Sequence, residues 1–199
     1  MSKAARHAAV RRETAETRIF LKLDIDGAGR SRVATGVPFF DHMLTLLAKH
    51  ALFDLEVKAE GDLEVDQHHT VEDTGIALGT ALKEALGNKA GIRRYGHAYV
   101  PMDETLSRAV VDLSGRVFFE YRVKNTRGLR CGDFPVTLVE EFFRALANQA
   151  QMNLHIENLY GRDAHHLAES IFKSVARALE EACRRDPRVK GTPSTKGVL

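Results

Sequence analysis

One motif occurs twice in this chain, and the repetition limits the possible folds more than any other feature of the sequence. Residues 66–72 and 163–169 both read Asp-x-His-His-x-x-Glu, and the two copies lie 97 residues apart in a chain of 199. Apolar residues follow each copy at helical spacing, so we expect each histidine pair to begin an amphipathic helix, with Asp66 and Asp163 as N-caps. A motif that recurs after half the chain predicts two similar halves.

The spacing within the motif indicates metal binding. Residues four apart share one face of a helix, so His68 can join Glu72 on one ion, and His165 can join Glu169 on another. Neighbouring histidines diverge by about 100° around the helix axis, so the two members of a pair cannot easily serve one ion. The simplest arrangement has two ions, each taking one histidine from each helix. Imidazole and carboxylate suit divalent Mn, Fe or Zn. One copy alone could be a histidine-rich surface helix, but two equivalent copies favour a metal site.

Composition excludes several classes of protein. The formal net charge is only +2, which argues against general nucleic-acid binding. Cys131 and Cys183 have no metal or redox spacing, so we expect the reduced thiols of a cytoplasmic protein. The first 18 residues are charged and lack an apolar run, so we expect no signal peptide. No segment approaches the roughly 20 apolar residues of a membrane span, so we expect no membrane partner.

The first half of the chain has alternating and helical patterns in turn. Residues 1–14 are polar, and we expect them to be frayed. Alternating apolar residues over 17–25 predict a half-buried strand, followed by a turn and a returning strand over 31–35, as in a hairpin. Pro38 predicts the start of a helix, and residues 53–57 alternate like another strand.

The turn after the first strand carries two acidic residues. Asp24 and Asp26 are spaced as in the nucleophile motif of aspartate-based phosphatases. A hairpin turn also favours Asp and Gly at these positions, so we interpret the stretch as a turn.

The second half repeats the plan of the first. Strands are predicted over 106–113 and 117–123, around a turn at Ser114 and Gly115. Pro135 lies 97 residues after Pro38, and we expect it to open a helix. Residues 152–156 alternate and precede the second motif. The sequence therefore predicts an α+β fold built by tandem duplication, with antiparallel-rich sheets covered on one side by helices.

The two halves, residues 1–95 and 96–199, are not identical. His42 and His155 have no histidine counterpart in the other half. These two unmatched histidines could add one further ligand to each of two ions.

Cations and hydroxyls near the ends of predicted elements could bind a phosphate. Arg94 and Arg116 each follow a glycine closely, and residues 193–197 read Pro-Ser-Thr-Lys-Gly. Hydroxyls and a cation in one short segment can wrap a phosphate, although each charge alone is more typical of a solvated surface or tail.

Six segments resemble imidazoleglycerol-phosphate dehydratases, in family order over nearly the whole chain. They are residues 39–44, 66–73, 105–116, 154–156, 165–169 and 193–197. The departures are small: Gln67 and Asn153 stand where the family usually has Asp and Thr. The resemblance implies a layered sheet/helix fold like domain 2 of ribosomal protein S5. It also implies a trimer-based assembly of twenty-four chains with active sites at subunit contacts.

The resemblance further implies a Mn²⁺-dependent enzyme of histidine biosynthesis, which eliminates water from imidazole glycerol phosphate to give imidazole acetol phosphate. Two Mn²⁺ ions per active site are implied. One ion is held by His42, His69, His165 and Glu169, and the other by His68, Glu72, His155 and His166. The implied substrate contacts are Glu16, His42, His68, Glu72, Arg94, Arg116, His165, Lys173, Ser194, Thr195 and Lys196. The implied catalytic residues are Glu16, His42, His69, Glu72, His166 and Glu169.

This chemistry suits metal ions and a carboxylate. The hydrogen to be lost is carbon-bound, with no carbonyl beside it, and is barely acidic. Two ions flanking the substrate imidazole can hold it as imidazolate, so that ring electrons expel the neighbouring hydroxyl. The hydrogen then becomes acidic enough for a carboxylate base, for which the resemblance suggests Glu16. By residue type alone, Glu16 is more typical of an exposed strand start.

Two alternative functions use the same residue types. A dinuclear metal hydrolase of phosphate esters would also need His, Glu and cations, and it would release inorganic phosphate. A non-catalytic assembly protein clipped by metal would show no turnover with its metal intact.

Overall fold

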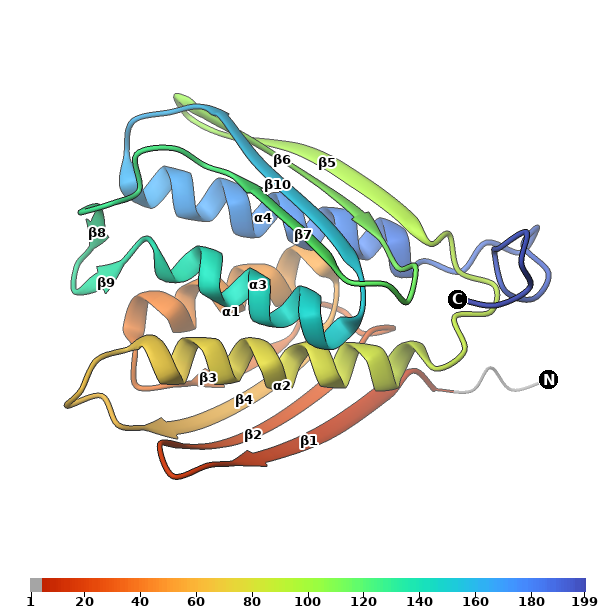
Figure 1. Cartoon of the computed structure of the whole chain (residues 1–199), viewed down its shortest axis with the longest axis horizontal. Helices are drawn as coiled ribbons and strands as arrows, with labels where there is room; N and C mark the ends of the chain where they lie inside the picture. The colour runs from red at the N-terminus through yellow and green to blue at the C-terminus, as the bar shows by residue number, and fades with distance from the viewer. Residues whose placement is uncertain (1–4) are drawn as a thin grey trace.

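The computed structural model describes residues 5–199, which form four layers: two outer four-stranded sheets with two layers of helices between them (Figure 1). The first half contains β1 (His7–Glu13), β2 (Thr17–Asp24), β3 (Ser31–Ala34), α1 (Pro38–Ala51), β4 (Asp54–Gly61) and α2 (His68–Leu86). The second half contains β5 (Tyr95–Met102), β6 (Thr105–Asp112), β7 (Phe118–Arg122), β8 (Arg130–Cys131), β9 (Phe134–Pro135), α3 (Leu138–Ala150), β10 (Asn153–Tyr160) and α4 (Ala164–Cys183).

The two sheets have the same topology. Their strand orders are β1-β2-β4-β3 and β5-β6-β10-β7. In each sheet the first three strands pair antiparallel, and the last strand joins in parallel, β3 to β4 and β7 to β10. This repetition confirms the predicted tandem duplication and the α+β class. Within residues 5–199, the short β8–β9 hairpin of the second half has no counterpart in the first.

Alternation along the strands buries one face of each sheet against helices. In β2, Ile19, Leu21 and Leu23 point inward and are at most 2% exposed. Helix α2 covers β1 and β2, α4 covers β5 and β6, and α1 and α3 lie over the parallel edges. The core therefore lies between each sheet and the helices that cover it. Each fully buried Leu or Ile there stabilises the fold by about 1.5–3 kcal/mol.

The two helix layers meet in the centre of the molecule, where α2 packs on α3 and α1 packs on α4 (Figure 1). Helix α2 approaches α3 very closely at Gly79, where an added Cβ would lie 2.5 Å from the carbonyl oxygen of Leu146. The crossing of α1 and α4 brings the N-terminal turns of both helices together.

The N-terminal segment differs from the prediction. Residues 7–13, which were expected to be frayed, form edge strand β1 on β2. Arg6 is buried, and its Nη1 donates to the carbonyl oxygen of Cys183 at 2.6 Å. The alternating apolar residues Ala8 and Val10 are small, so their pattern is weak, yet both pack against the core. The expectation for residues 1–4 lies outside the described residues.

The predicted pairing of neighbouring strands was wrong at two places. Strand β3 does not return along β2, because β4 lies between them and pairs with both. The strands predicted over 106–113 and 117–123 are separated in the same way by β10. A turn signal indicates that the chain changes direction, but it does not say which strand will fill the place beside it.

Two further boundaries differ. Pro135 ends β9, and helix α3 begins three residues later at Leu138. Asp163 is an N-cap as predicted, but the N-cap of α2 is Gln67 rather than Asp66. The carboxylate of Asp66 still accepts from the backbone N–H of His68 at 2.7 Å. Strand β5 was not predicted. No helix among residues 5–199 combines the length and the apolar composition that a membrane crossing requires.

Candidate metal centre

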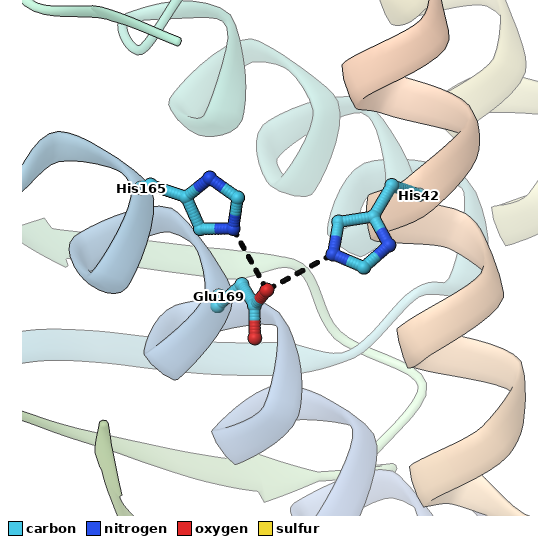
Figure 2. Close-up of side chains that lie close together, drawn as sticks. All are labelled: His42, His165 and Glu169. Carbon is cyan, nitrogen blue, oxygen red and sulfur yellow. Dashed lines mark hydrogen bonds and ion pairs between the residues drawn. The ribbon is translucent and has the colours of Figure 1, made fainter. Parts of the chain in front are cut away.

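Two histidines and a glutamate from the crossing of α1 and α4 converge on one point (Figure 2). His42 lies near the start of α1, while His165 and Glu169 lie one turn apart at the start of α4. The Nε2 atoms of His42 and His165 each lie 2.9 Å from Oε1 of Glu169. Local sequence fixes both helix starts, because Pro38 occupies the first turn of α1 and the Asp163 carboxylate caps α4.

The carboxylate at the centre of this triad is buried and charged. Glu169 is 5% exposed, and its second oxygen pairs with the ammonium group of Lys173. Burial raises the pKa of Glu169, but hydrogen bonds from Lys173, His42 and His165 outweigh it and lower the pKa to about 2. The triad therefore presents an ionised carboxylate and two imidazole nitrogens at neutral pH.

The geometry of the triad fits a divalent metal ion. Its three ligand atoms lie within 4.8 Å of one another. Adjacent ligand atoms around an octahedral ion with bonds of about 2.1 Å are about 3 Å apart, close to the separations between Glu169 and each histidine. Mixed nitrogen and oxygen ligands suit Mn, Fe or Zn. Three protein ligands also leave coordination positions for further groups.

A cavity of about 690 Å³ adjoins the triad. His42 and His165 form part of its wall, and the β8–β9 hairpin of the second half forms another part. Sequence analysis missed this hairpin because each of its strands has only two residues. Cys131 also lines the cavity, and burial raises the pKa of its thiol to about 11, so in the metal-free chain the thiol stays protonated at neutral pH.

The first motif forms a second polar cluster at the start of α2. Nε2 of His68 lies 3.6 Å from Oε2 of Glu72, as the i,i+4 spacing predicted. Nδ1 of His69 lies 3.0 Å from Oδ2 of Asp62 and 3.7 Å from Oε2 of Glu16. The hydrogen bond that His69 donates to Asp62 raises the pKa of His69.

The remaining expected ligands lie elsewhere. Nδ1 of His166 lies 2.7 Å from Oε2 of Glu104, and this hydrogen bond raises the pKa of His166. His155 points outward from β10, with its ring 5.4 Å from that of Phe118. Of the two expected ligand sets, one chain brings together His42, His165 and Glu169 from the first, and His68 and Glu72 from the second.

The expected phosphate contacts gather at the other end of the molecule. Arg94 hydrogen-bonds to Asp112 at 2.7 Å and to the carbonyl oxygen of Pro193 at 2.9 Å, so it contacts the C-terminal tail. The backbone N–H of Arg94 also donates to the carbonyl oxygen of Ala182. Ala182 lies thirteen residues after Glu169 on α4, which corresponds to about 20 Å along a helix.

Other expected substrate contacts divide between the two ends. The carbonyl oxygen of Arg116 accepts from Asn153 at the start of β10, and Ser194, Thr195 and Lys196 follow Pro193 in the tail beside the C-terminal end of α4 (Figure 1). Lys173, by contrast, belongs to the triad end, because it pairs with Glu169. In a single chain, therefore, most of the cations lie far from the triad.

Sequence analysis also missed Asp62 and Glu104, which contact the second histidine of each pair. Neither residue belongs to the duplicated motif, and they are not equivalent to each other, since Asp62 follows β4 and Glu104 lies in the turn from β5 to β6. Only the folded chain brings them beside the helix starts.

Comparisons with known proteins agree on one family. The sequence profile described as imidazoleglycerol-phosphate dehydratase matches residues 35–179. Proteins of that name from Bordetella avium and Thiobacillus denitrificans are 57% and 59% identical over 195 residues, covering 98% of this chain and 100% of each relative.

Two solved structures have folds similar to that of this chain. The crystal structure of imidazoleglycerol-phosphate dehydratase from Staphylococcus aureus has a TM-score of 0.82 and 38% identity, covering 90% of this chain and 99% of that one. The enzyme from Pyrococcus furiosus, in complex with (S)-C348, has a TM-score of 0.82 and 36% identity, covering 96% of this chain and 100% of that one.

Proposed function

Because the chain belongs to the imidazoleglycerol-phosphate dehydratase family, and is therefore a hydro-lyase of histidine biosynthesis, we propose that it dehydrates imidazole glycerol phosphate to imidazole acetol phosphate with two Mn²⁺ ions per active site. The observation that carries the metal dependence is the convergence of His42, His165 and Glu169. Their nitrogen and oxygen atoms suit Mn²⁺, and the low pKa of Glu169 keeps its carboxylate ionised for binding.

When bound, the ions supply Lewis-acid stabilisation of charge on the substrate imidazole. The residues of the chain supply the rest. His42 and His165 would hold an ion through the Nε2 atoms that hydrogen-bond to Glu169 in the metal-free chain, and Glu169 orients both rings. Glu16 is the proposed proton carrier, because its carboxylate is 53% exposed and lies near a proposed ligand, His69. Its exposure leaves it accessible to a bound substrate.

We propose that each active site combines residues from different copies of the chain. Two observations support this: His155 faces outward from β10, and most of the proposed phosphate-binding cations lie at the opposite end of α4 from the triad. A substrate with a short glycerol phosphate arm cannot span about 20 Å, so a cation cluster from a neighbouring chain must reach the metal end. A trimer-based assembly of twenty-four chains would meet this need.

The proposed phosphate contacts are Arg94, Arg116, Lys173, Ser194, Thr195 and Lys196. The guanidinium of Arg94 is already held by Asp112 and Pro193, which fixes its direction before substrate binds. Prior ordering of a cation reduces the entropy lost on binding an anion. The hydroxyls and ammonium group of the tail would complete the contacts to phosphate oxygens.

The deciding experiment is a product assay. Metal-stripped protein is reloaded with Mn²⁺, incubated with imidazole glycerol phosphate, and examined for imidazole acetol phosphate. We expect the ketone product and no inorganic phosphate, and we expect Glu169→Gln to abolish turnover. Release of inorganic phosphate would instead support the dinuclear hydrolase, and no turnover by protein with two bound ions would support the assembly protein.

A further inference from the structure

The second histidine of each pair has the same kind of partner in both halves of the molecule. Nδ1 of His69 lies 3.0 Å from the Asp62 carboxylate, and Nδ1 of His166 lies 2.7 Å from the Glu104 carboxylate. The two carboxylates come from non-equivalent positions, one after β4 and one in the β5–β6 turn. Both halves therefore have a carboxylate beside Nδ1 of the second histidine, although different positions of the fold supply it.

A carboxylate beside Nδ1 determines which nitrogen of a neutral histidine carries the proton. An ionised carboxylate can only accept, so the Nδ1 atom carries the hydrogen and donates. The Nε2 atom is then left with a free lone pair, which is what a metal ion needs. Such carboxylate partners also hold the ring in one orientation and increase the basicity of the ligand.

We propose that Asp62 and Glu104 are positioning residues, each of which fixes the Nδ1–H form of one histidine and aims its Nε2 atom at a metal ion. This inference rests on the proposed two-ion site. In that site His69 and His166 serve different ions, so each carboxylate supports one ion. Loss of one carboxylate should weaken one binding event and leave the other unchanged.

The surroundings of Glu104 show that it is held rigidly. Its Oε1 atom accepts from the backbone N–H groups of Arg162 and Asp163, at 3.1 and 2.9 Å, leaving Oε2 for His166. The residue therefore ties the β5–β6 turn to the loop that precedes α4. A rigid carboxylate can orient a ligand more accurately than a mobile one.

The surroundings of Asp62 suggest a division of roles with Glu16. The side chain of Asp62 is 20% exposed and takes the hydrogen bond of His69, whereas that of Glu16 is 53% exposed and lies 0.7 Å farther from the same Nδ1 atom. Because Asp62 orients the histidine, Glu16 stays available for proton transfer.

The test measures binding of the metal alone. Metal-stripped protein is titrated with Mn²⁺, and the free ion is followed by electron paramagnetic resonance. We expect two ions per chain for the wild type. In Asp62→Ala one ion should bind about 10–100-fold more weakly, since outer partners of metal ligands typically contribute that much, and in Glu104→Gln the other ion should be weakened. The double variant should weaken both.

Glu104→Gln also has a spectroscopic signature that a merely structural role would not produce. If the Gln oxygen keeps the two backbone hydrogen bonds, its NH₂ group faces His166 and can only donate, which forces the proton from Nδ1 to Nε2. Ring-¹⁵N histidine spectra of metal-free protein should show Nδ1–H at His166 in the wild type and Nε2–H in the variant. An unchanged tautomer in the variant would overturn the assignment for Glu104.

Glu60→Ala is the matched control, because Glu60 is exposed, lies two residues before Asp62 and pairs with Lys58. It should bind Mn²⁺ like the wild type. If Glu104→Gln does not fold, Asp62→Ala still tests the proposal, because the wild-type Asp62 carboxylate makes its hydrogen bonds to His69. Wild-type affinity for both ions in Asp62→Ala would overturn the proposal. A wild-type protein that binds fewer than two ions would instead contradict the two-ion site itself.

Discussion

Two histidines and one glutamate meet where α1 crosses α4, and their neighbours set the charge of the group they form. Glu169 receives hydrogen bonds from His42, His165 and Lys173, which keep its buried carboxylate ionised. At the start of α2 the carboxylates of Asp62 and Glu16 differ in exposure and in distance from His69. At the scale of single residues, the proposed chemistry thus depends on which carboxylates are fixed by hydrogen bonds, as Glu169 and Asp62 are, and which is exposed enough to transfer a proton, as Glu16 is.

Glu16→Gln tests the proposed proton carrier. Glutamine keeps the size of the side chain but cannot accept a proton as a carboxylate does. We expect kcat to fall by about 10²–10⁴-fold, the usual contribution of a general acid–base group, with Mn²⁺ stoichiometry and KM little changed. Steady-state kinetics and metal analysis measure both effects. Glu13→Gln, three residues earlier and also exposed, is the control. A kcat within a few-fold of wild type would assign the proton transfer to another residue.

The pKa of Glu169 predicts how the metal-free protein responds to acid. Its folded-state pKa of about 2 lies below the ordinary value of 4.5, so the carboxylate contributes stability that is fully present above pH 4.5. That contribution is lost as pH falls from 4.5 toward 2. We expect the urea midpoint of metal-free wild type to drop more steeply over this range than that of Glu169→Gln. Parallel curves for the two proteins would contradict the prediction.

At the scale of elements, the packing of helices on one another decides where the triad forms and how the two halves of the chain join. The α1–α4 crossing holds the triad, and the related α2–α3 crossing joins the two halves of the chain in the same way. Gly75 and Gly79 permit the close approach of α2, since a Cβ at either would lie 2.6 Å or less from a carbonyl oxygen of α3. These glycines are therefore explained by packing rather than by turns.

Gly79→Ala should destabilise the protein even though alanine favours helices. Its Cβ would lie 2.5 Å from the carbonyl oxygen of Leu146 and 2.8 Å from Cβ of Gln149, so α2 and α3 must separate. Overpacking typically costs about 1–3 kcal/mol, against a helix-propensity gain of up to about 1 kcal/mol. We expect a lower urea midpoint with an unchanged slope. Lys83→Ala, on the exposed side of α2, should leave the midpoint close to wild type. A Gly79→Ala midpoint at or above that of wild type would show that the crossing tolerates the methyl group.

The arrangement of the whole molecule separates the two kinds of proposed site residue. The triad lies at the N-terminal end of α4, while Arg94 and the C-terminal tail lie at its other end (Figure 1). His155 projects from the outer surface of the second sheet. At this scale one chain keeps the triad apart from most of the proposed phosphate contacts, which is the basis of the proposed assembly.

Removal of metal should therefore affect assembly before folding. Six of the eight proposed ligands are histidines, which must be neutral to bind metal, so chelator or a pH below about 6.5 should release the ions. We expect light scattering to show conversion of a large assembly into smaller oligomers, with unchanged circular dichroism because the hydrophobic core of the chain contains none of the proposed ligands. Mn²⁺ at neutral pH should restore both size and activity. Unchanged mass after verified metal removal would show that the ions do not link chains.

Mixed assemblies test whether sites are shared between chains. Glu169→Gln damages the metal end and Lys196→Ala the phosphate end, so each protein alone should have little activity. When the two are dissociated by chelator, mixed and reassembled with Mn²⁺, some sites should receive an intact triad from one chain and an intact tail from another. We expect activity well above that of either variant reassembled alone. No gain in verified mixed assemblies would show that each site is built within one chain.

The sequence by itself determined the duplication, the α+β class and the pairing of His165 with Glu169 and of His68 with Glu72. These features depend on repeat spacing and helical periodicity, which are local and survive in any fold that forms the helices. The Asp163 N-cap was predictable for the same reason.

The tertiary structure alone decided which distant residues meet. His42 joins Glu169 across 127 positions of sequence because α1 packs on α4, and Asp62 and Glu104 reach their histidines through strand and turn placement. Insertion of β4 and β10 beside β2 and β6 overrode the hairpins that turn signals predicted. Sheet pairing and helix crossing minimise the free energy of the whole chain, and a local pattern does not carry that information.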